Sequence, residues 1–236
     1  DPPYGLSYNG INNPYGRYWN IIKGDKLRND DLYKLLNGAF IQVHHVTINN
    51  PAIYVWHAAT NHIIFESALN DAGFEVKEQL IWNKGMILGH SDYHWAHEPC
   101  FYVRKKGNNN EWFGDRKHKT ILRNEKIDFT KMKKEELIQI IHAIRDDSTV
   151  WEVKRDNVKT YVHPTQKPVD LALKAIINNT RNDGIVLDLF GGSGSTLIGC
   201  EQLNRVCYAM ELDEKYADVI VQRWENFTGR KAELIK

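Results

Sequence analysis

The sequence predicts an α/β protein with a doubly wound, mostly parallel sheet, and three observations lead to that class. Strand-like and helix-like stretches alternate along most of the 236 residues. A strand at 184–190 runs into closely spaced glycines and then a helix at 195–203, the kind of turn at which open α/β sheets bind ligands. The next strand, at 205–212, ends beside the carboxylate of Glu211. A parallel sheet covered by helices is the expected result.

The first half of the chain shows helical and then alternating patterns. Apolar residues recur every three or four positions over 32–46, which predicts a helix that ends before "NNP" at 49–51. A buried strand at 52–57, a helix at 61–73 closed by Gly73, and strands at 74–84 and 98–105 are expected to follow.

The alternation breaks between about 105 and 160, which indicates an inserted segment with one charged helix at 131–146. Residues 103–134 carry eleven Lys or Arg against four acids, a charge of +7, so the rest of the chain carries −6 of the total +1. A basic segment on an acidic body is the pattern expected of a contact with a phosphate backbone. A solvated surface insertion is the alternative reading.

Regular elements resume after the insertion. The pattern predicts a helix at 169–180, a strand at 184–190, helices at 195–203 and 214–227, a strand at 205–212 between them, and a short terminal strand near 231–235. The chain has no apolar run near the ~18 residues that cross a bilayer. Its three cysteines lack a Cys-x-x-Cys spacing, so a reducing, cytoplasmic setting fits better than a disulfide framework or a zinc ribbon.

The glycine loop carries the first chemical signal. Asp188 ends its strand, Gly191, Gly192 and Gly194 follow, and Glu211 comes 17 residues after Gly194. A carboxylate at that place can accept hydrogen bonds from the two ribose hydroxyls of an adenosyl group, so an adenosine-containing cofactor is predicted. The third glycine of a dinucleotide motif is missing, and a plain tight turn is the alternative.

Three motifs occur in one order: "DPPY" at 1–4, "HPTQKP" at 163–168 and "FGGSG" at 190–194. This order, with the basic insertion in the middle, resembles the β class of the amino-methylating DNA methyltransferases over essentially the whole chain. The resemblance implies a circularly permuted, Rossmann-like methyltransferase sheet. Residues 1–104 would form its catalytic half, 105–160 an inserted target-recognition segment, and 161–236 its cofactor-binding half.

The residues of "DPPY" suit that chemistry. An exocyclic amine of a base is a poor nucleophile because its lone pair is delocalised into the ring. The Asp1 carboxylate and the Pro2 carbonyl could accept the two amine hydrogens and free that lone pair. The rings of Pro2 and Pro3 restrict the backbone torsions and so keep the Pro2 carbonyl pointing in one direction. Tyr4 would stack on a base drawn out of the duplex.

The resemblance also implies roles for individual residues. Catalysis would rest on Asp1, Pro2, Pro3 and Tyr4. Binding of S-adenosylmethionine, with no metal, would involve Asp1, Thr165, Lys167, Asp188, Phe190, Gly191, Gly192, Gly194 and Glu211. Contacts with the DNA target are assigned to Tyr93, His94, Trp112, Arg116, Lys117 and Lys119, with His97 as a further weak candidate.

Several of these residues have a structural alternative. "HPTQKP" could simply start a helix at Pro168. Trp112 and Phe113 could anchor the insertion on the body of the protein. Cys100 leads into an apolar strand and is read as a core residue rather than a nucleophile. His94, His97 and Glu98 resemble a metal site only superficially.

The expected function is methylation of the N6 amine of a flipped adenine in double-stranded DNA, because the first motif residue is Asp. Alternatives are N4-cytosine methylation, methylation of RNA or of a protein glutamine, and an inactive DNA-binding module. A bacterial or phage origin and a cytoplasmic location are expected, no membrane partner is, and a homodimer stays open. "DPPY" normally follows a central strand, so residues upstream of Asp1 are predicted to supply that strand.

Overall fold

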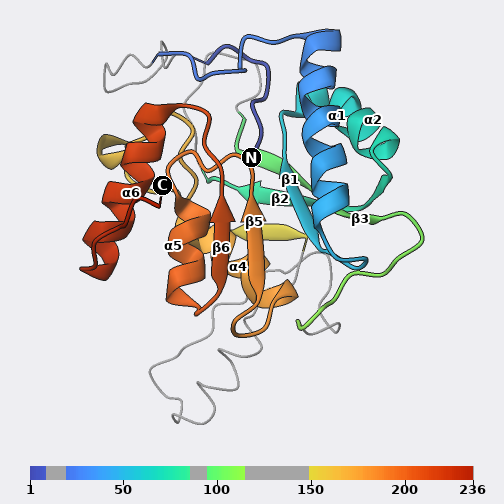
Figure 1. Ribbon diagram of the computed structural model, residues 1–236. Coiled ribbons are helices and arrows are strands. Elements are labelled where there is room, and N and C mark those ends of the chain that lie inside the picture. The colour runs from blue at the N-terminus through green and yellow to red at the C-terminus, as the bar shows by residue number, and fades with distance from the viewer. Residues whose placement is uncertain (9–19, 86–94, 115–148, 236) are drawn as a thin grey trace, which may run out of the picture.

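A computed structural model describes residues 1–8, 20–85, 95–114 and 149–235. Two sheets lie within these ranges, one of four strands and one of two (Figure 1). The alternation of strands and helices predicted an α/β class, and the described elements confirm it. No helix in these ranges is both long and apolar enough to cross a membrane.

The larger sheet has the order β1-β3-β2-β4. Its strands are β1 (Ile53–Trp56), β2 (Phe74–Asn83), β3 (His97–Lys105) and β4 (Val150–Glu152). Strand β3 lies between β1 and β2 and is antiparallel to both, whereas β4 runs parallel to β2.

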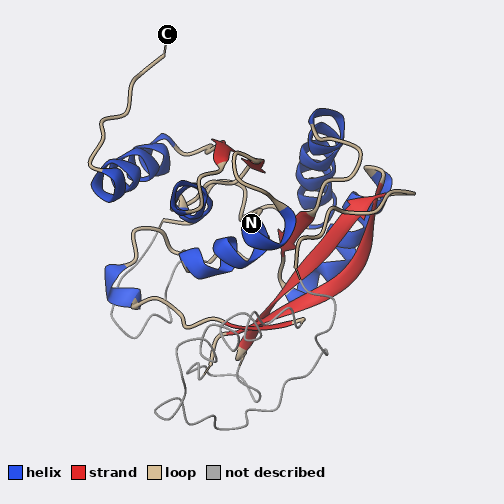
Figure 2. Ribbon diagram, turned by 90° about the horizontal axis from the view of Figure 1, so that it is seen from below, coloured by secondary structure: helices blue, strands red, loops and turns tan. Residues whose placement is uncertain are grey.

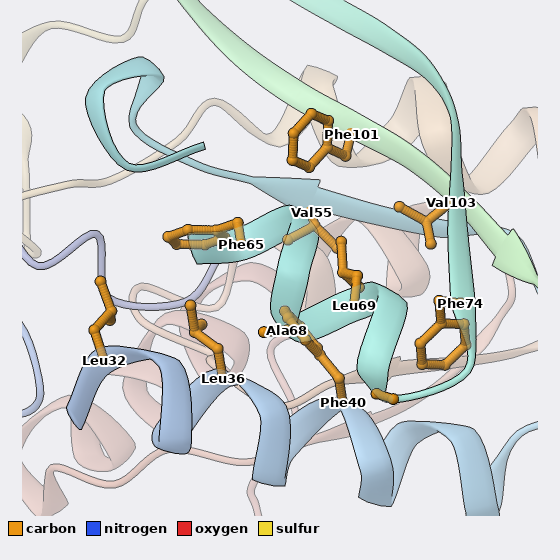
Figure 3. Close-up of a cluster of buried hydrophobic side chains, with 11 residues drawn as sticks. Leu32, Leu36, Phe40, Val55, Phe65, Ala68, Leu69, Phe74, Phe101 and Val103 are labelled. Carbon is orange, nitrogen blue, oxygen red and sulfur yellow. The ribbon is translucent and has the colours of Figure 1, made fainter. Parts of the chain in front are cut away.

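Helices cover both faces of this sheet. Helices α1 (Asn29–Val46) and α2 (His62–Asp71), the latter preceded by the 3₁₀ turn η1 (Ala59–Asn61), cover one face. Figure 3 shows Leu32, Leu36 and Phe40 of α1 turned toward Phe65 and Leu69 of α2 and toward the strands. Helix α4 (Val169–Asn179) covers the opposite face, where Leu171 packs in a cluster of three tryptophans with Leu80 and Cys100.

The smaller sheet pairs β5 (Ile185–Asp188) with β6 (Val206–Ala209) in parallel. Helix α5 (Ser195–Gln202) connects these strands, and α6 (Glu214–Thr228) follows β6. Figure 2 shows α4, α5 and α6 grouped on the side of the molecule away from α1 and α2. Helices on both sides of the strands match the doubly wound class that the alternation predicted.

Three details differ from the sequence prediction. The strand at 98–105 was expected in a parallel sheet, yet it pairs antiparallel with β2: the chain leaves β2 at Asn83 and enters β3 at His97, directly opposite Asn83 in the register. Strand β4, with the short turn η3 (Val158–Thr160) after it, lies inside the segment taken as an insertion and was not predicted. The predicted terminal strand at 231–235 is wrong: the tail binds the end of α6 through the Glu225 side chain instead of pairing with a strand. The charged helix expected at 131–146 lies outside the described residues.

Candidate functional site

The "DPPY" segment forms a fixed corner beside the ends of two strands. Pro2 and Pro3 are buried, and the carbonyl of Tyr4 accepts a hydrogen bond of 2.7 Å from the side chain of Asn61. The chain then turns at Gly5, whose φ is +71°. A Cβ at Gly5 would lie 2.8 Å from a neighbouring backbone oxygen, so the turn requires glycine.

A compact group of charges surrounds this corner. The Lys167 ammonium lies 2.6 Å from Asp1 Oδ1, 2.9 Å from Glu98 Oε1 and 3.0 Å from the Tyr4 hydroxyl. The Tyr4 hydroxyl lies 2.5 Å from Glu98 Oε1 and 3.0 Å from Asp1 Oδ1. Lys84 forms an ion pair with the second oxygen of Glu98. Two carboxylates and two ammonium groups therefore balance around one phenol.

Burial and charge shift the pKa values in this group. Burial on its own would raise the pKa of Glu98, but the ammonium groups of Lys167 and Lys84 outweigh it and hold the pKa well below its ordinary value. Burial lowers the pKa of Lys84, and Glu98 opposes that shift. Burial and then the Glu98 charge raise the pKa of Tyr4. The phenol therefore stays protonated and can act as a hydrogen-bond donor.

The glycine loop lies between β5 and α5. Asp188 Oδ1, at the end of β5, accepts the Phe190 amide hydrogen at 3.0 Å. Glu211 Oε2 accepts the Gly192 amide hydrogen at 2.8 Å, so the predicted ribose-binding acid also orders the loop. Gly192 and Gly194 have φ values of +54° and +78°, which a side chain disfavours. The backbone is thereby open to a close ligand approach.

Gly191 is required for a different reason. Its backbone N–H donates to the Met210 carbonyl at 2.8 Å and joins the loop to the chain after β6. A Cβ there would lie 2.9 Å from the Ile220 side chain and 3.2 Å from the Met210 oxygen. A larger residue at this position would therefore require the Ile220 side chain and the Met210 carbonyl to shift.

The "HPTQKP" motif joins the two parts of the site. Its Lys167 side chain bonds to Asp1, while its Lys167 carbonyl accepts a 2.7 Å hydrogen bond from Ser195 at the start of α5. Thr165 bonds through its backbone N–H to His163 Nδ1 at 3.3 Å. Pro168 directly precedes α4, as the helix-start alternative required. The motif thus brings the corner and the glycine loop to one place.

The nucleic-acid candidates Tyr93, His94, Arg116, Lys117 and Lys119 lie outside the described residues. Trp112, the sixth, packs edge-on against the Tyr102 ring, with centroids 6.3 Å apart. The backbone N–H of Phe113 donates to the Asn178 carbonyl at 2.7 Å, and Arg181 lies over the Phe113 ring. These contacts favour the anchoring alternative for both aromatic residues.

Two charged residues of the site were not predicted. Glu98 was noticed only as a false metal ligand, and Lys84 only as the end of a strand. A Glu beside a predicted catalytic pocket was the available signal, but its partners Lys84, Lys167 and Tyr4 lie 14, 69 and 94 positions away along the chain. His97, a weak target candidate, is exposed, and its ring lies tilted against that of Trp95, with centroids 5.8 Å apart. Cys100 lies fully buried in the core, as predicted, and burial raises the pKa of its thiol.

Known proteins resemble this chain over most of its length. A family model described as DNA methylase matches residues 1–222. The Type II methyltransferase M2.MboI of Moraxella bovis is 26% identical to this chain, covering 97% of it and 80% of the relative. The Type II methyltransferase M2.DpnII of Streptococcus pneumoniae is 26% identical, with 95% and 80% covered.

Solved structures share the fold. The structure titled M1.HpyAVI-SAM complex aligns with a TM-score of 0.62 at 22% identity, covering 84% of this chain and 85% of its own. The PvuII DNA methyltransferase, titled cytosine-N4-specific, aligns with a TM-score of 0.60 at 13% identity, covering 98% and 84%. At such identities the likeness concerns the fold alone.

Proposed function

This chain belongs to the DNA methylase family, and from that premise we propose that it transfers a methyl group from S-adenosylmethionine to the N6 amine of an adenine flipped out of double-stranded DNA. One observation carries the proposal. Lys167 holds the Asp1 carboxylate by its side chain and the start of α5 by its carbonyl, so the "DPPY" corner and the glycine loop share one site.

The residues present fit S-adenosylmethionine. Gly192 has no side chain, and the atoms nearest to a Cβ at this position would be those of the His163 ring, at 3.7 Å. Glu211 and Asp188 present carboxylates on either side of that loop, at the ends of neighbouring strands. Acceptors at these places suit ribose hydroxyls and a cationic methionine end. When bound, the cofactor supplies an electrophilic methyl group on a sulfonium.

The chain's own groups would act on the target amine. Asp1 and the Pro2 carbonyl accept its two hydrogens, which localises the nitrogen lone pair. Both acceptors are fixed before the base arrives, because buried prolines hold the backbone and Lys167 holds the carboxylate at 2.6 Å. An acceptor that is already aimed costs no reorganisation when the methyl group transfers.

N4-cytosine methylation is the second candidate. The matching family model covers both N6- and N4-methylating enzymes and so favours neither base. The Asp at the first motif position supports the adenine assignment. Both bases present an exocyclic amine with two hydrogens, so the same acceptors would serve either.

The test combines labelled S-adenosylmethionine, double-stranded DNA and nucleoside chromatography. We expect label in N6-methyladenine and a loss in kcat on the order of a hundredfold or more in Asp1→Ala. Label only in N4-methylcytosine would move the assignment to cytosine. Absence of DNA-dependent transfer by the parent protein would refute the function.

Double-stranded DNA is therefore the proposed partner, and the bacterial cytoplasm the proposed location, which the bacterial origin of the relatives supports. A homodimer remains a proposal that light scattering of the pure protein at working concentration would test.

A strand upstream of Asp1 is a further part of this proposal. Among the described residues β5 pairs only with β6, and β1 is the edge of its sheet. Lys167, which binds Asp1, also lies over the ring of Trp56, the last residue of β1. A strand leading into Asp1 would fill both edges. Hydrogen exchange of a protein extended upstream should show protected β5 and β1 amides; unchanged exchange would refute the strand.

A further inference from the structure

Glu98 is a nearly buried carboxylate that the chemistry above leaves without a role. Its side chain is 12% exposed, and it stands on β3 directly opposite Trp82 of β2. Lys84, just beyond β2, continues the pairing through a 2.8 Å hydrogen bond from its backbone N–H to the Ala96 carbonyl. Two paired strands therefore place Glu98 and Lys84 against each other, and Glu98 also contacts Tyr4.

Lys167 and Tyr4 together offer fewer hydrogen-bonding hydrogens than the oxygens of Asp1, Glu98 and Tyr4 can accept. The Lys167 ammonium has three, and its contacts with Asp1, Glu98 and the Tyr4 oxygen use all of them. The Tyr4 hydroxyl has one hydrogen but lies within reach of both Glu98 and Asp1. The shorter contact, 2.5 Å against 3.0 Å, directs that hydrogen to Glu98.

We propose that Glu98 is a positioning residue: it takes the Tyr4 hydroxyl hydrogen and one N–H of Lys167, and so keeps the Asp1 carboxylate available to the target amine. The inference rests on the proposed function. In the described part of the chain, the contacts of the Asp1 side chain all fall on Oδ1. Oδ2 is then the oxygen that accepts from the amine. Without Glu98, the phenol hydrogen would turn to Asp1 Oδ1 and withdraw negative charge from the carboxylate whose Oδ2 must accept from the amine.

Charge balance gives Glu98 a second effect. Its carboxylate neutralises Lys84 while sharing Lys167 with Asp1. Removing that charge would leave the poorly solvated ammonium groups of Lys84 and Lys167 with Asp1 as the remaining carboxylate of this group. Lys84 can be removed together with Glu98, which restores the balance and separates the charge effect from the loss of the acceptor.

The experiment compares kcat and the KM for S-adenosylmethionine in five variants: Glu98→Ala, Glu98→Gln, each of these combined with Lys84→Met, and the control Glu75→Gln. The control removes a carboxylate charge on the same strand pair, where Glu75 binds Arg104 away from the site. The control should retain the parent kcat. Thermal unfolding of every variant shows whether it is folded.

Glu98→Ala should lower kcat by about tenfold to a hundredfold, as expected when reacting groups are misplaced, while KM changes far less. In the Glu98→Gln background, adding Lys84→Met should restore most of the parent kcat, because the Gln amide oxygen still accepts from Tyr4. In the Glu98→Ala background, the same addition should not restore kcat. Parent kcat in Glu98→Ala, or full recovery of Glu98→Ala by Lys84→Met, would overturn the inference.

The outcomes also separate this inference from the proposed function. An active parent with an unaffected Glu98→Ala variant refutes only the role of Glu98. An inactive parent refutes the function itself. If Glu98→Ala does not fold, the comparison of Glu98→Gln with and without Lys84→Met decides: equal kcat values would overturn the inference.

Discussion

Tyr4→Phe removes one oxygen from the centre of the site and keeps the aromatic ring. That oxygen lies 2.5 Å from Glu98 Oε1 and 3.0 Å from the Lys167 ammonium. The ring keeps its edge-on contact with Phe65, at a centroid distance of 6.3 Å. The variant therefore separates a hydrogen-bonding role of Tyr4 from stacking on a flipped base.

The size of the effect follows from the partners that remain. A hydrogen bond to a charged group contributes about 1.5–3 kcal/mol. Part of this is retained, because Glu98 keeps both lysines and Lys167 keeps Asp1. We expect the free energy of unfolding to fall by about 1–2 kcal/mol, which lowers Tm by about 2–8 °C for a chain of this size.

Activity should fall as well, because Lys167 and Glu98 lose the hydroxyl that fixes their positions relative to Asp1. Single-turnover methyl transfer should slow by about tenfold, while affinity for DNA, which the ring supports, changes little. Calorimetric unfolding and rapid-quench methyl transfer measure the two effects. A Tyr4→Phe protein with the parent Tm and the parent rate would show that only the ring matters and would refute the reasoning.

Two further predictions concern the glycine loop and buried histidines. Gly194→Ala should destabilise the protein by about 1–2 kcal/mol in urea unfolding, because φ is +78° and the new Cβ would lie 3.2 Å from Ile220. The control Gly38→Ala, within α1, should instead stabilise the protein by up to about 1 kcal/mol. Equal effects of the two substitutions would contradict this. Burial lowers the pKa of His57 and of His163 from 6.5 to about 4, so protonation favours the unfolded chain. The free energy of unfolding should therefore fall between pH 6.5 and pH 4, by on the order of 2–3 kcal/mol per histidine. A free energy of unfolding that stays constant over this range in chemical denaturation would be the contrary result.

The backbone elements were largely predictable because their signals are local. Apolar spacing identified α1, α2 and the strands on either side of α2 to within a few residues. Glycines at required positive φ marked the loop before α5. The prediction of a terminal strand was wrong because it, too, used only local signals. An apolar pattern near the end of the chain does not reveal whether the edge of a sheet is close enough to pair with.

Sequence by itself determined the α/β class, the "DPPY" corner, the glycine loop with Glu211 and the family, because each depends on residues close together in the chain or on the order of short motifs. Only the tertiary structure decided that β3 returns antiparallel and that Lys84, Glu98 and Lys167 meet around Tyr4 and Asp1. Those contacts join residues up to 166 positions apart. They arise from strand pairing and helix packing, and no local pattern encodes which distant charge a buried carboxylate will find.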